Sequence, residues 1–185
     1  MLDLIIRGGR VVTPEGAGLR DIAVAGERIA EVAAPEALKD LPAARIIDAS
    51  GKLVFPGGID PHIHCDWPVQ PGKDGGPPLL SAGSAPVSRA ALFGGTTTLI
   101  DFAVWNAGET LEQAIARRDR QWRGQSHCDY AFHVTLFGKI PPTTLNELPE
   151  AMQSGFPTVK IFTTNIRPSI TDRKVGFGDI WEIFK

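Results

Sequence analysis

The segment Asp60-Pro-His-Ile-His-Cys-Asp66 carries two histidines, His62 and His64, that are separated by a single residue. On a β-strand, residues i and i+2 point to the same face, so the two imidazoles would lie side by side. Two neutral imidazoles can each supply one nitrogen ligand to a shared divalent metal ion. A bare His-x-His pair also fits two ordinary polar residues of a strand. We favour a metal site because the pair ends a predicted strand and is flanked by Asp60 and Asp66.

Other polar side chains have a structural explanation beside the functional one. Asp101 ends a predicted strand, where it either supports the histidine ligands by hydrogen bonding or forms a helix cap or loop turn. His133 lies within a strand, which favours a hydrogen-bonded core histidine over a ligand, whereas His127 is expected to be solvated. Cys65 would point away from the imidazoles, so we do not predict it as a ligand. Three aromatic residues follow strand ends and either wall a substrate pocket or pack in the core: Trp67, Phe102 and Trp105.

The first fifty-six residues contain short apolar, β-branched runs that predict strands. Residues 4–12 form two such runs, separated by a turn or bulge at Gly8-Gly9. Residues 21–32 predict a hairpin around Gly26, and residues 45–55 repeat the pattern with a turn at residues 48–51. We therefore expect a small β unit whose open edges need a covering partner.

After Pro56-Gly57-Gly58 the pattern changes to strands that alternate with helices. We predict strands over residues 58–64, 96–102, 130–136 and 158–162. Helices are predicted over residues 84–93, over residues 110–124 with Thr110 and Gln113 as a capping box, and from a cap at residues 144–147 to Gly155. One side of the second helix carries, at helical spacing, Leu111, Ala114, Ile115, Arg118 and Trp122, with the arginine stem covering apolar surface.

Strands joined by crossover helices pair in parallel, which predicts an α/β fold. A closed (β/α)8 barrel takes about 250 residues, and this sequence holds four β-α repeats at most. We therefore expect residues 57–185 to form the first, truncated half of a (β/α)8 TIM barrel. Functional groups of such a barrel lie at the carboxyl ends of its strands, where the two histidines are predicted to be.

The composition limits the classes of partner. The chain has 185 residues, a formal net charge of -2 and 43% hydrophobic residues, which suits a folded domain and does not favour nucleic acid or an anionic membrane as partner. No apolar run approaches the roughly 20 residues of a membrane-spanning helix, and the first residues do not resemble a signal peptide. We predict a cytoplasmic protein in which Cys65 and Cys128 are thiols.

Four segments resemble a known family. Val54-Phe-Pro-Gly-Gly-Ile-Asp-Pro-His-Ile-His64 resembles the signature of the cyclic amidohydrolases, which comprise hydantoinases, dihydropyrimidinases, allantoinases and dihydroorotases. Ala91-Leu-Phe-Gly-Gly-Thr-Thr-Thr-Leu-Ile-Asp-Phe102 is similar to the hydantoinase and dihydropyrimidinase branch, as are Cys128-Asp-Tyr-Ala-Phe-His133 and Gly155-Phe-Pro-Thr-Val-Lys-Ile-Phe162. The resemblance implies a barrel flanked by a β-sandwich built from both chain ends, so residues 1–56 would be sandwich strands. It also implies a small cyclic amide substrate and a homo-oligomer, a dimer or tetramer, at full length.

The resemblance further implies two divalent metal ions, usually zinc. His62 and His64 would bind one ion, and Lys160 would be N-carboxylated and bridge both. Lys160 lies between two apolar residues, so a strand would direct it away from them; it would otherwise be a surface lysine or part of a buried salt bridge. Burial favours a neutral amine, and only that form reacts with carbon dioxide to give a carbamate, an anion that two cations would stabilise.

The sequence also departs from the family pattern. Where hydantoinases and dihydropyrimidinases usually carry a tyrosine that stabilises the oxyanion, this chain has Asn165, whose amide could still donate a hydrogen bond. Two further histidine ligands and a catalytic aspartate of the family come from later strands, so we expect the 185-residue chain alone to be inactive.

These observations predict a metal-dependent hydrolase of cyclic amide or imide C–N bonds. An allantoinase-like or other amidohydrolase, and a non-catalytic binding scaffold, are the alternatives. The missing tyrosine favours the first alternative, and the combination of His62, His64 and Lys160 argues against the second.

Overall fold

The computed structural model describes residues 2–165 and 173–185 of the chain. The chain divides into two compact units, Met1–Pro56 and Gly57–Lys185, and each is described by itself. Within the described residues, no helix is long and apolar enough to cross a lipid bilayer.

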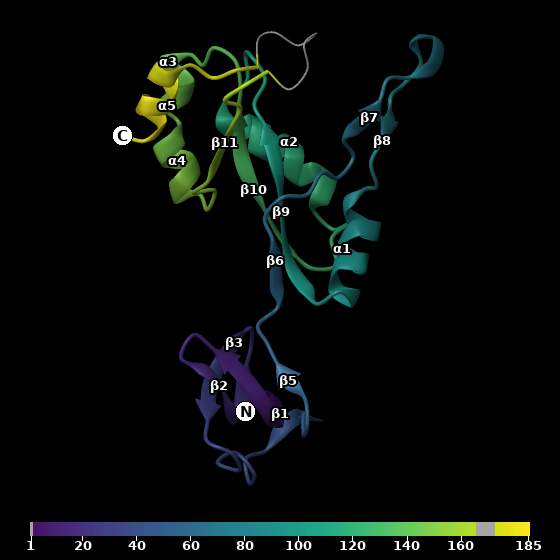
Figure 1. The fold of residues 1–185 in the computed structure, drawn as a ribbon, viewed down its shortest axis with the longest axis vertical. Coiled ribbons are helices and arrows are strands. Elements are labelled where there is room, and N and C mark those ends of the chain that lie inside the picture. Colours follow the sequence, from purple (N-terminus) through teal and green to yellow (C-terminus); the bar gives the residue numbers. More distant parts are fainter. Residues whose placement is uncertain (1, 166–172) are drawn as a thin grey trace. The chain divides into compact units, whose positions relative to one another are not determined.

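The first unit is a mixed five-stranded sheet with the strand order β3-β2-β1-β4, in which β5 also pairs with β1 (Figure 1). The strands are β1 (Leu2–Thr13), β2 (Gly16–Ala25), β3 (Arg28–Ala33), β4 (Ala43–Asp48) and β5 (Leu53–Val54). The predicted hairpin is present, because β2 and β3 are antiparallel and Gly26 turns between them with a φ of 60°. A small apolar core holds the unit together: Ile5, Ala23, Ala33 and Leu38, with Leu2 and Ala43 packed against it.

Residues 45–55 do not form a second hairpin, because β4 and β5 do not pair with each other. Both run parallel to β1 along the same edge, β4 beside residues 2–7 and β5 beside residues 10–11. The predicted turn at residues 48–51 interrupts this edge, and a β-bulge in β1 between Ile6 and Gly9 lies opposite it. A side chain at Gly9 would be 2.6 Å from Val54, so the glycine is what allows the close approach of β5.

The second unit is built on a four-stranded sheet in the order β11-β10-β9-β6 (Figure 1), and its strands pair in parallel as predicted. Its strands are β6 (Gly58–Asp60), β9 (Thr96–Val104), β10 (Asp129–Leu136) and β11 (Val159–Ile161). The helices are α1 (Ser84–Phe93), α2 (Leu111–Trp122), α3 (Pro142–Leu145), α4 (Leu148–Gln153) and α5 (Phe177–Ile183). A small antiparallel pair, β7 (Pro68–Gln70) and β8 (Leu79–Leu80), surrounds a 3-10 turn (Lys73–Gly75) and was not predicted.

Helix α2 begins and ends as its sequence predicts. The Thr110 side chain accepts a hydrogen bond from the Gln113 backbone, and the Gln113 side chain accepts one from the Thr110 backbone. Gly124, with a φ of 73°, follows the end of the helix. The predicted apolar side is the buried side, but Arg118 is buried with it instead of covering apolar surface from the outside.

Two predicted boundaries differ from the structure by four residues, and β9 continues past Asp101 to Val104 instead of ending there. The first strand was predicted to reach His64 but ends at Asp60, because Pro61 has no N–H to donate to a strand ladder. The two histidines therefore lie on the segment that follows the strand. The helix predicted from a cap at residues 144–147 begins only at Leu148, because Thr144 lies inside the separate short helix α3.

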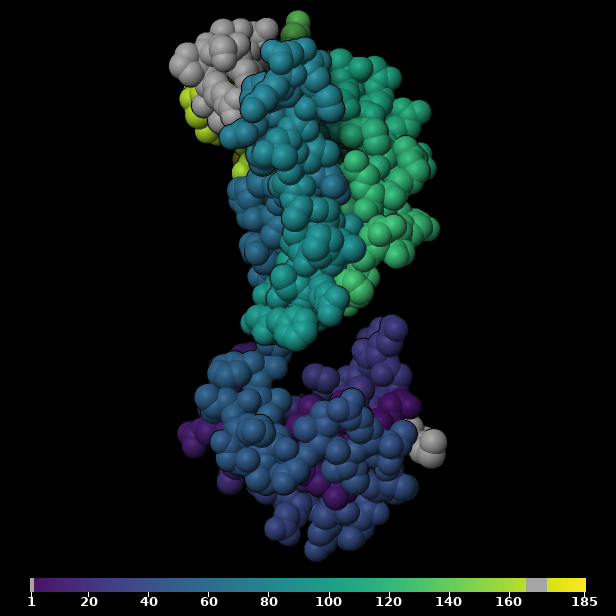
Figure 2. All heavy atoms as spheres, turned by 90° about the vertical axis from the view of Figure 1, so that its right-hand side faces the viewer, coloured from purple at the N-terminus to yellow at the C-terminus, as the bar shows by residue number. Residues whose placement is uncertain are grey.

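The two faces of the parallel sheet differ in chemistry. One face packs under the helices through the apolar side chains Leu99, Ala103, Phe132, Val134, Leu136, Val159 and Ile161. The alternate residues Phe102, His133, Thr135 and Lys160 belong to the other face, where Phe102 pairs with His133 and Thr135 pairs with Lys160. Figure 2 shows α1 and the β7–β8 segment (blue to teal) running alongside α2 (green).

Candidate metal centre

His62, His64 and Lys160 line one cavity of about 420 Å³. The cavity opens on the sheet face opposite the helices, beyond the end of β6 and beside the last residues of β9 and β10. Apart from these three residues its walls are mostly apolar: Trp67, Pro68, Val69, Phe102, Thr135 and Phe162. The structure therefore brings together three side chains that lie as much as ninety-eight positions apart in the sequence (160 − 62 = 98).

The two imidazoles lie side by side with their Nε2 atoms 3.2 Å apart. Two nitrogens that bind one tetrahedral zinc ion at 2.0–2.1 Å are about 3.3–3.4 Å apart. The observed separation fits this arrangement. Among the described residues, no third histidine, cysteine, aspartate or glutamate joins the pair to form a three-ligand group.

Phe102 forms the base on which the three groups converge. The ring centroids of His62 and His64 each lie 4.8 Å from that of Phe102. The Nζ atom of Lys160 lies 5.4 Å from the Phe102 centroid and 5.8 Å from that of Phe162. Within the part of the chain that the structure describes, no carboxylate lies within ion-pair distance of Lys160. Both distances are within the range of a cation–π contact between an amine and an aromatic face.

Burial and the neighbouring imidazole of His62 lower the pKa of His64. The lowered pKa keeps the ring neutral at neutral pH, and the neutral ring is the form that can bind a metal ion. The pair therefore has the spacing that a metal ion needs, and His64 has the protonation state.

Comparison with known proteins places this geometry in context. No family model matches the chain. It is 35% identical to the D-hydantoinase of Geobacillus stearothermophilus over 159 residues, which cover 85% of this chain and 32% of the relative. It is also 35% identical to the dihydropyrimidinase of Rattus norvegicus over 146 residues, 72% of this chain and 25% of the relative. A crystal structure of D-hydantoinase superposes with a TM-score of 0.79 at 32% identity, covering 98% of this chain and 36% of that one.

The chain is a homologue of the hydantoinase and dihydropyrimidinase family. It spans about a third of the length of the relatives it matches. Its mixed sheet and parallel half-barrel sheet correspond to the N-terminal part of hydantoinase structures, which confirms the predicted fold class.

In this hydantoinase homologue, Asp101 contacts neither imidazole. Its carboxylate is fully buried and accepts hydrogen bonds from the backbone of Cys65 at 3.4 Å and from Trp122 Nε1 at 3.2 Å. It also forms an ion pair with Arg118. Asp101 does not cap a helix, and its carboxylate holds the backbone that follows His64. Its predicted support of the histidine ligands stays a prediction.

Sequence reasoning missed Arg118 as part of the site. A charged residue in the middle of the apolar side of an amphipathic helix is costly to bury without a partner. Asp101 is likewise a charged residue within an otherwise apolar strand. Pairing the two buried charges would have identified the contact before the structure did.

The remaining candidates are two histidines and three aromatic residues. His133 is hydrogen-bonded through both ring nitrogens, to Thr158 at 2.7 Å and to the backbone oxygen of Pro61 at 2.8 Å, as expected of a structural histidine. His127 is exposed, as predicted. Of the three aromatic residues, Trp67 and Phe102 wall the cavity, whereas Trp105 is buried in the helix-side core.

Cys65 and Cys128 are both free thiols. The Cys65 thiol is buried in the core under the helices and does not line the cavity, and this burial raises its pKa to about 12. Asn165 is exposed and is not among the residues that line the cavity; its side-chain oxygen accepts a hydrogen bond from the Lys174 backbone at 3.3 Å. Its predicted contact with an oxyanion stays a prediction.

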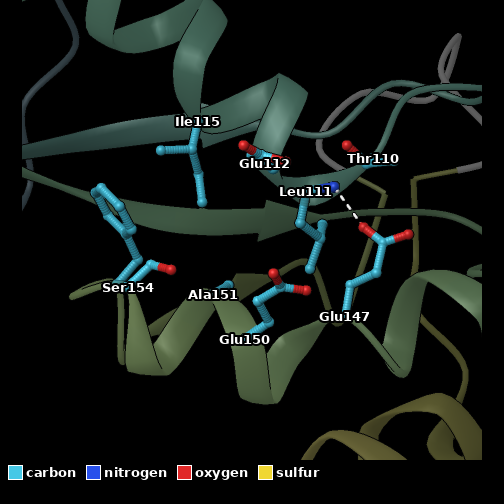
Figure 3. A pocket seen from close by; sticks show the side chains of 9 residues that line it. Thr110, Leu111, Glu112, Ile115, Glu147, Glu150, Ala151 and Ser154 are labelled. Carbon is cyan, nitrogen blue, oxygen red and sulfur yellow. Dashed lines mark hydrogen bonds between the residues drawn. The ribbon is translucent and has the colours of Figure 1, made fainter.

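A second cavity, of about 320 Å³, lies between α2 and α4 and is lined by Glu112, Glu147 and Glu150 among others (Figure 3). Glu147 accepts a hydrogen bond from the Leu111 backbone at 2.6 Å. The first N–H groups of a helix lack partners within the helix, and its dipole favours an anion there. Glu147 therefore caps α2 rather than its own helix, and this contact explains its position without a ligand.

Proposed function

We propose that this chain contributes the first metal-binding half of a hydrolase that opens cyclic amide or imide C–N bonds. The observation that supports the proposal most directly is the 3.2 Å separation of the His62 and His64 Nε2 atoms in a cavity that Lys160 also lines. The family relationship supports the same reaction class, because the relatives include a D-hydantoinase and a dihydropyrimidinase.

In the proposed enzyme, His62 and His64 would hold one divalent ion, and Lys160, as a carbamate, would supply a ligand to that ion and to a second one. Bound divalent ions supply a hydroxide nucleophile near neutral pH and polarise the carbonyl group that is attacked. Trp67, Phe102 and Phe162 form apolar walls that exclude water and pack against the substrate ring. Zinc is the proposed metal, and the proton that the leaving nitrogen requires would come from a residue outside this chain.

The first experiment tests the reaction class with the protein at its native length. Metal content is measured, and hydantoin, dihydrouracil and allantoin are offered as substrates before and after removal of the metal with a chelator. We expect up to two divalent ions per subunit and ring opening of at least one substrate that is lost on chelation and restored by zinc. A metal-free protein that opens none of the three rings would instead support the binding scaffold.

The second experiment tests the carbamate on Lys160. Native mass spectrometry of the metal-loaded protein, without acid, should show an excess of about 44 Da for one bound carbon dioxide. The excess should disappear in Lys160→Arg and persist in Lys139→Arg, which changes an exposed lysine as the matched control. A fully metal-loaded protein of unmodified mass would disprove the carbamate while leaving the histidine pair intact.

The proposal retains two further predictions from the sequence, a cytoplasmic location and assembly into a dimer or tetramer. Sedimentation of the protein at its native length would test the second. A monomer at micromolar concentration would contradict it.

A further inference from the structure

The backbone of Cys65, directly after His64, is held on both sides by a buried ion pair. Its N–H donates to the Asp101 carboxylate at 3.4 Å, and its carbonyl accepts from the Arg118 guanidinium. Asp101 and Arg118 are both buried, and Arg118 reaches Cys65 from helix α2 across a separation of 53 positions. One pair of side chains from two elements therefore fixes both hydrogen-bonding groups of a single loop residue.

The same loop is held from its other side by Ser81. The Ser81 hydroxyl donates to the His64 carbonyl at 2.7 Å and accepts from the Trp67 N–H at 2.9 Å. Asp66, between them, has a left-handed φ of 51°, and its N–H donates to the Ala82 carbonyl at 3.2 Å. Four consecutive residues thus have their backbone fixed by contacts from outside the loop.

The imidazole rings themselves lack such support. Metal-binding histidines usually donate their second ring nitrogen to a carboxylate or carbonyl, which sets the ring orientation. Among the described residues, the only hydrogen bond of either ring joins the two Nε2 atoms. The orientation of the His64 ring must therefore come from the backbone that carries it and from its packing against Phe102 and Trp67, with centroids 4.8 Å and 4.4 Å away.

We propose that Arg118 is a positioning residue for His64, acting through Asp101 and the Cys65 backbone, and that Ser81 completes this support from the opposite side. The metal-binding part of this inference rests on the proposed function. A pair that served stability alone could contact each other without the loop, whereas here both partners also bond to Cys65. Loss of a contact that orients a ligand typically weakens metal binding about 10–100-fold.

The test compares three variants of the protein at its native length: Arg118→Met, Ser81→Ala and, as control, Arg117→Met. Arg117 is the adjacent residue of α2 and has its own ion pair with Glu109 at 2.7 Å, away from the loop. Ser81→Ala removes two loop contacts without leaving a buried charge, so it remains informative if Arg118→Met does not fold. The first measurement is the dissociation constant for Co²⁺ alone, with the visible spectrum of the bound ion.

The second measurement needs no metal. In the metal-free protein, alkylation by iodoacetamide followed by peptide mass mapping gives the rates at Cys65, which is buried, and at Cys128, which is partly exposed. A loop that opens locally exposes Cys65 only, whereas a general loss of stability exposes both thiols. The ratio of the two rates therefore separates positioning from folding.

We expect Arg118→Met and Ser81→Ala to raise the Co²⁺ dissociation constant about 10–100-fold and to change the visible spectrum of the bound ion. Both variants should also increase the ratio of the alkylation rate at Cys65 to that at Cys128. Arg117→Met should behave like the unsubstituted protein in all three respects. Unchanged Co²⁺ binding and an unchanged ratio in a folded Arg118→Met protein would overturn the proposal, as would an unchanged Ser81→Ala protein if the first variant does not fold. If the unsubstituted protein binds no Co²⁺, the proposed function fails, and the rate ratio alone still decides whether these residues hold the loop.

Discussion

Asp101→Asn removes a negative charge from the most buried polar position of the parallel sheet. The carboxylate is fully buried, and it accepts from the backbone of Phe102 at 2.7 Å as well as from Cys65, Trp122 and Arg118. An asparagine would place an NH₂ group against at least one of these donors and would leave the Arg118 charge without a counter-ion. Breaking a buried pair by removing one partner costs about 3–5 kcal/mol. We therefore expect a loss of that size in the free energy of unfolding.

The double variant Asp101→Leu/Arg118→Leu tests what the pair does beyond neutralising charge. An isolated buried ion pair can often be replaced by apolar residues at little cost. Here the replacement leaves three buried groups without a hydrogen-bond partner, because their described hydrogen bonds all go to this pair. These groups are the N–H and carbonyl of Cys65 and the Nε1 of Trp122. Each buried polar group without a partner costs about 1–3 kcal/mol. The double variant should therefore remain about 3 kcal/mol or more less stable than the unsubstituted protein.

Urea denaturation of the metal-free protein at its native length measures both effects. A loss of 4 kcal/mol corresponds to a fall of roughly 2 M in the urea midpoint. The control is Glu182→Gln on the exposed pair with Lys185, which should cost about 0–1 kcal/mol. A loss below about 1 kcal/mol for Asp101→Asn, or full recovery of stability in the double variant, would refute the reasoning.

Three further predictions concern single positions. Thr110→Ala removes the capping bond of α2 and should cost about 1 kcal/mol in thermal unfolding, with Thr110→Ser near neutral. The pKa of His64 is lowered in the folded state, so the unfolded chain takes up the proton first as the pH falls. The stability that this ring contributes is therefore present above about pH 6.5 and is lost as the pH falls through the pKa of His64 in the folded protein. His64→Gln should therefore flatten the pH dependence of the urea midpoint of the metal-free protein in that range, and an unchanged profile would contradict this. Gly57→Ala places a Cβ 1.9 Å from the Thr97 hydroxyl and should cost about 1–3 kcal/mol, whereas Gly18→Ala, which meets no atom within 4 Å, should be neutral in urea denaturation.

Local signals explain what the sequence could predict of the fold. The boundaries of α1 are those predicted, because a glycine pair follows Phe93 and Gly95 takes a φ of 82°. Helix α2 was predicted from a capping box and a helical apolar stripe, both of which are local patterns. The parallel pairing of the four strands followed from the alternation of strands and helices.

Features that depend on distant residues could not be predicted in the same way. The β7–β8 pair has only three and two residues, and its sequence holds no alternating apolar pattern. The pairing of β4 and β5 with the same edge of β1 is decided by the close approach that Gly9 permits, which neither segment reveals alone. The role of Arg118 was missed because its partner lies 17 positions earlier on another element.

For the candidate site, the sequence identified which side chains meet but not how they are held. Residue types and spacing were enough to nominate His62 and His64, because chemistry restricts metal-binding side chains to a few types. Lys160 was nominated by the resemblance to the cyclic amidohydrolases. Their support comes from the backbone contacts of the loop and from the base provided by Phe102, which are tertiary features.

The contacts that fix the histidine loop also set an order of events during synthesis. The carbonyl of Pro61 is held by His133, 72 positions later, and that of Cys65 by Arg118, 53 positions later. A ribosome delivers the loop well before either anchor, so the nascent chain carries both imidazoles without a defined spacing. We expect metal binding to follow the packing of α2 and β10 against the loop. A bound ion would then indicate that the sheet has already formed, and metal binding would not be the event that starts its folding.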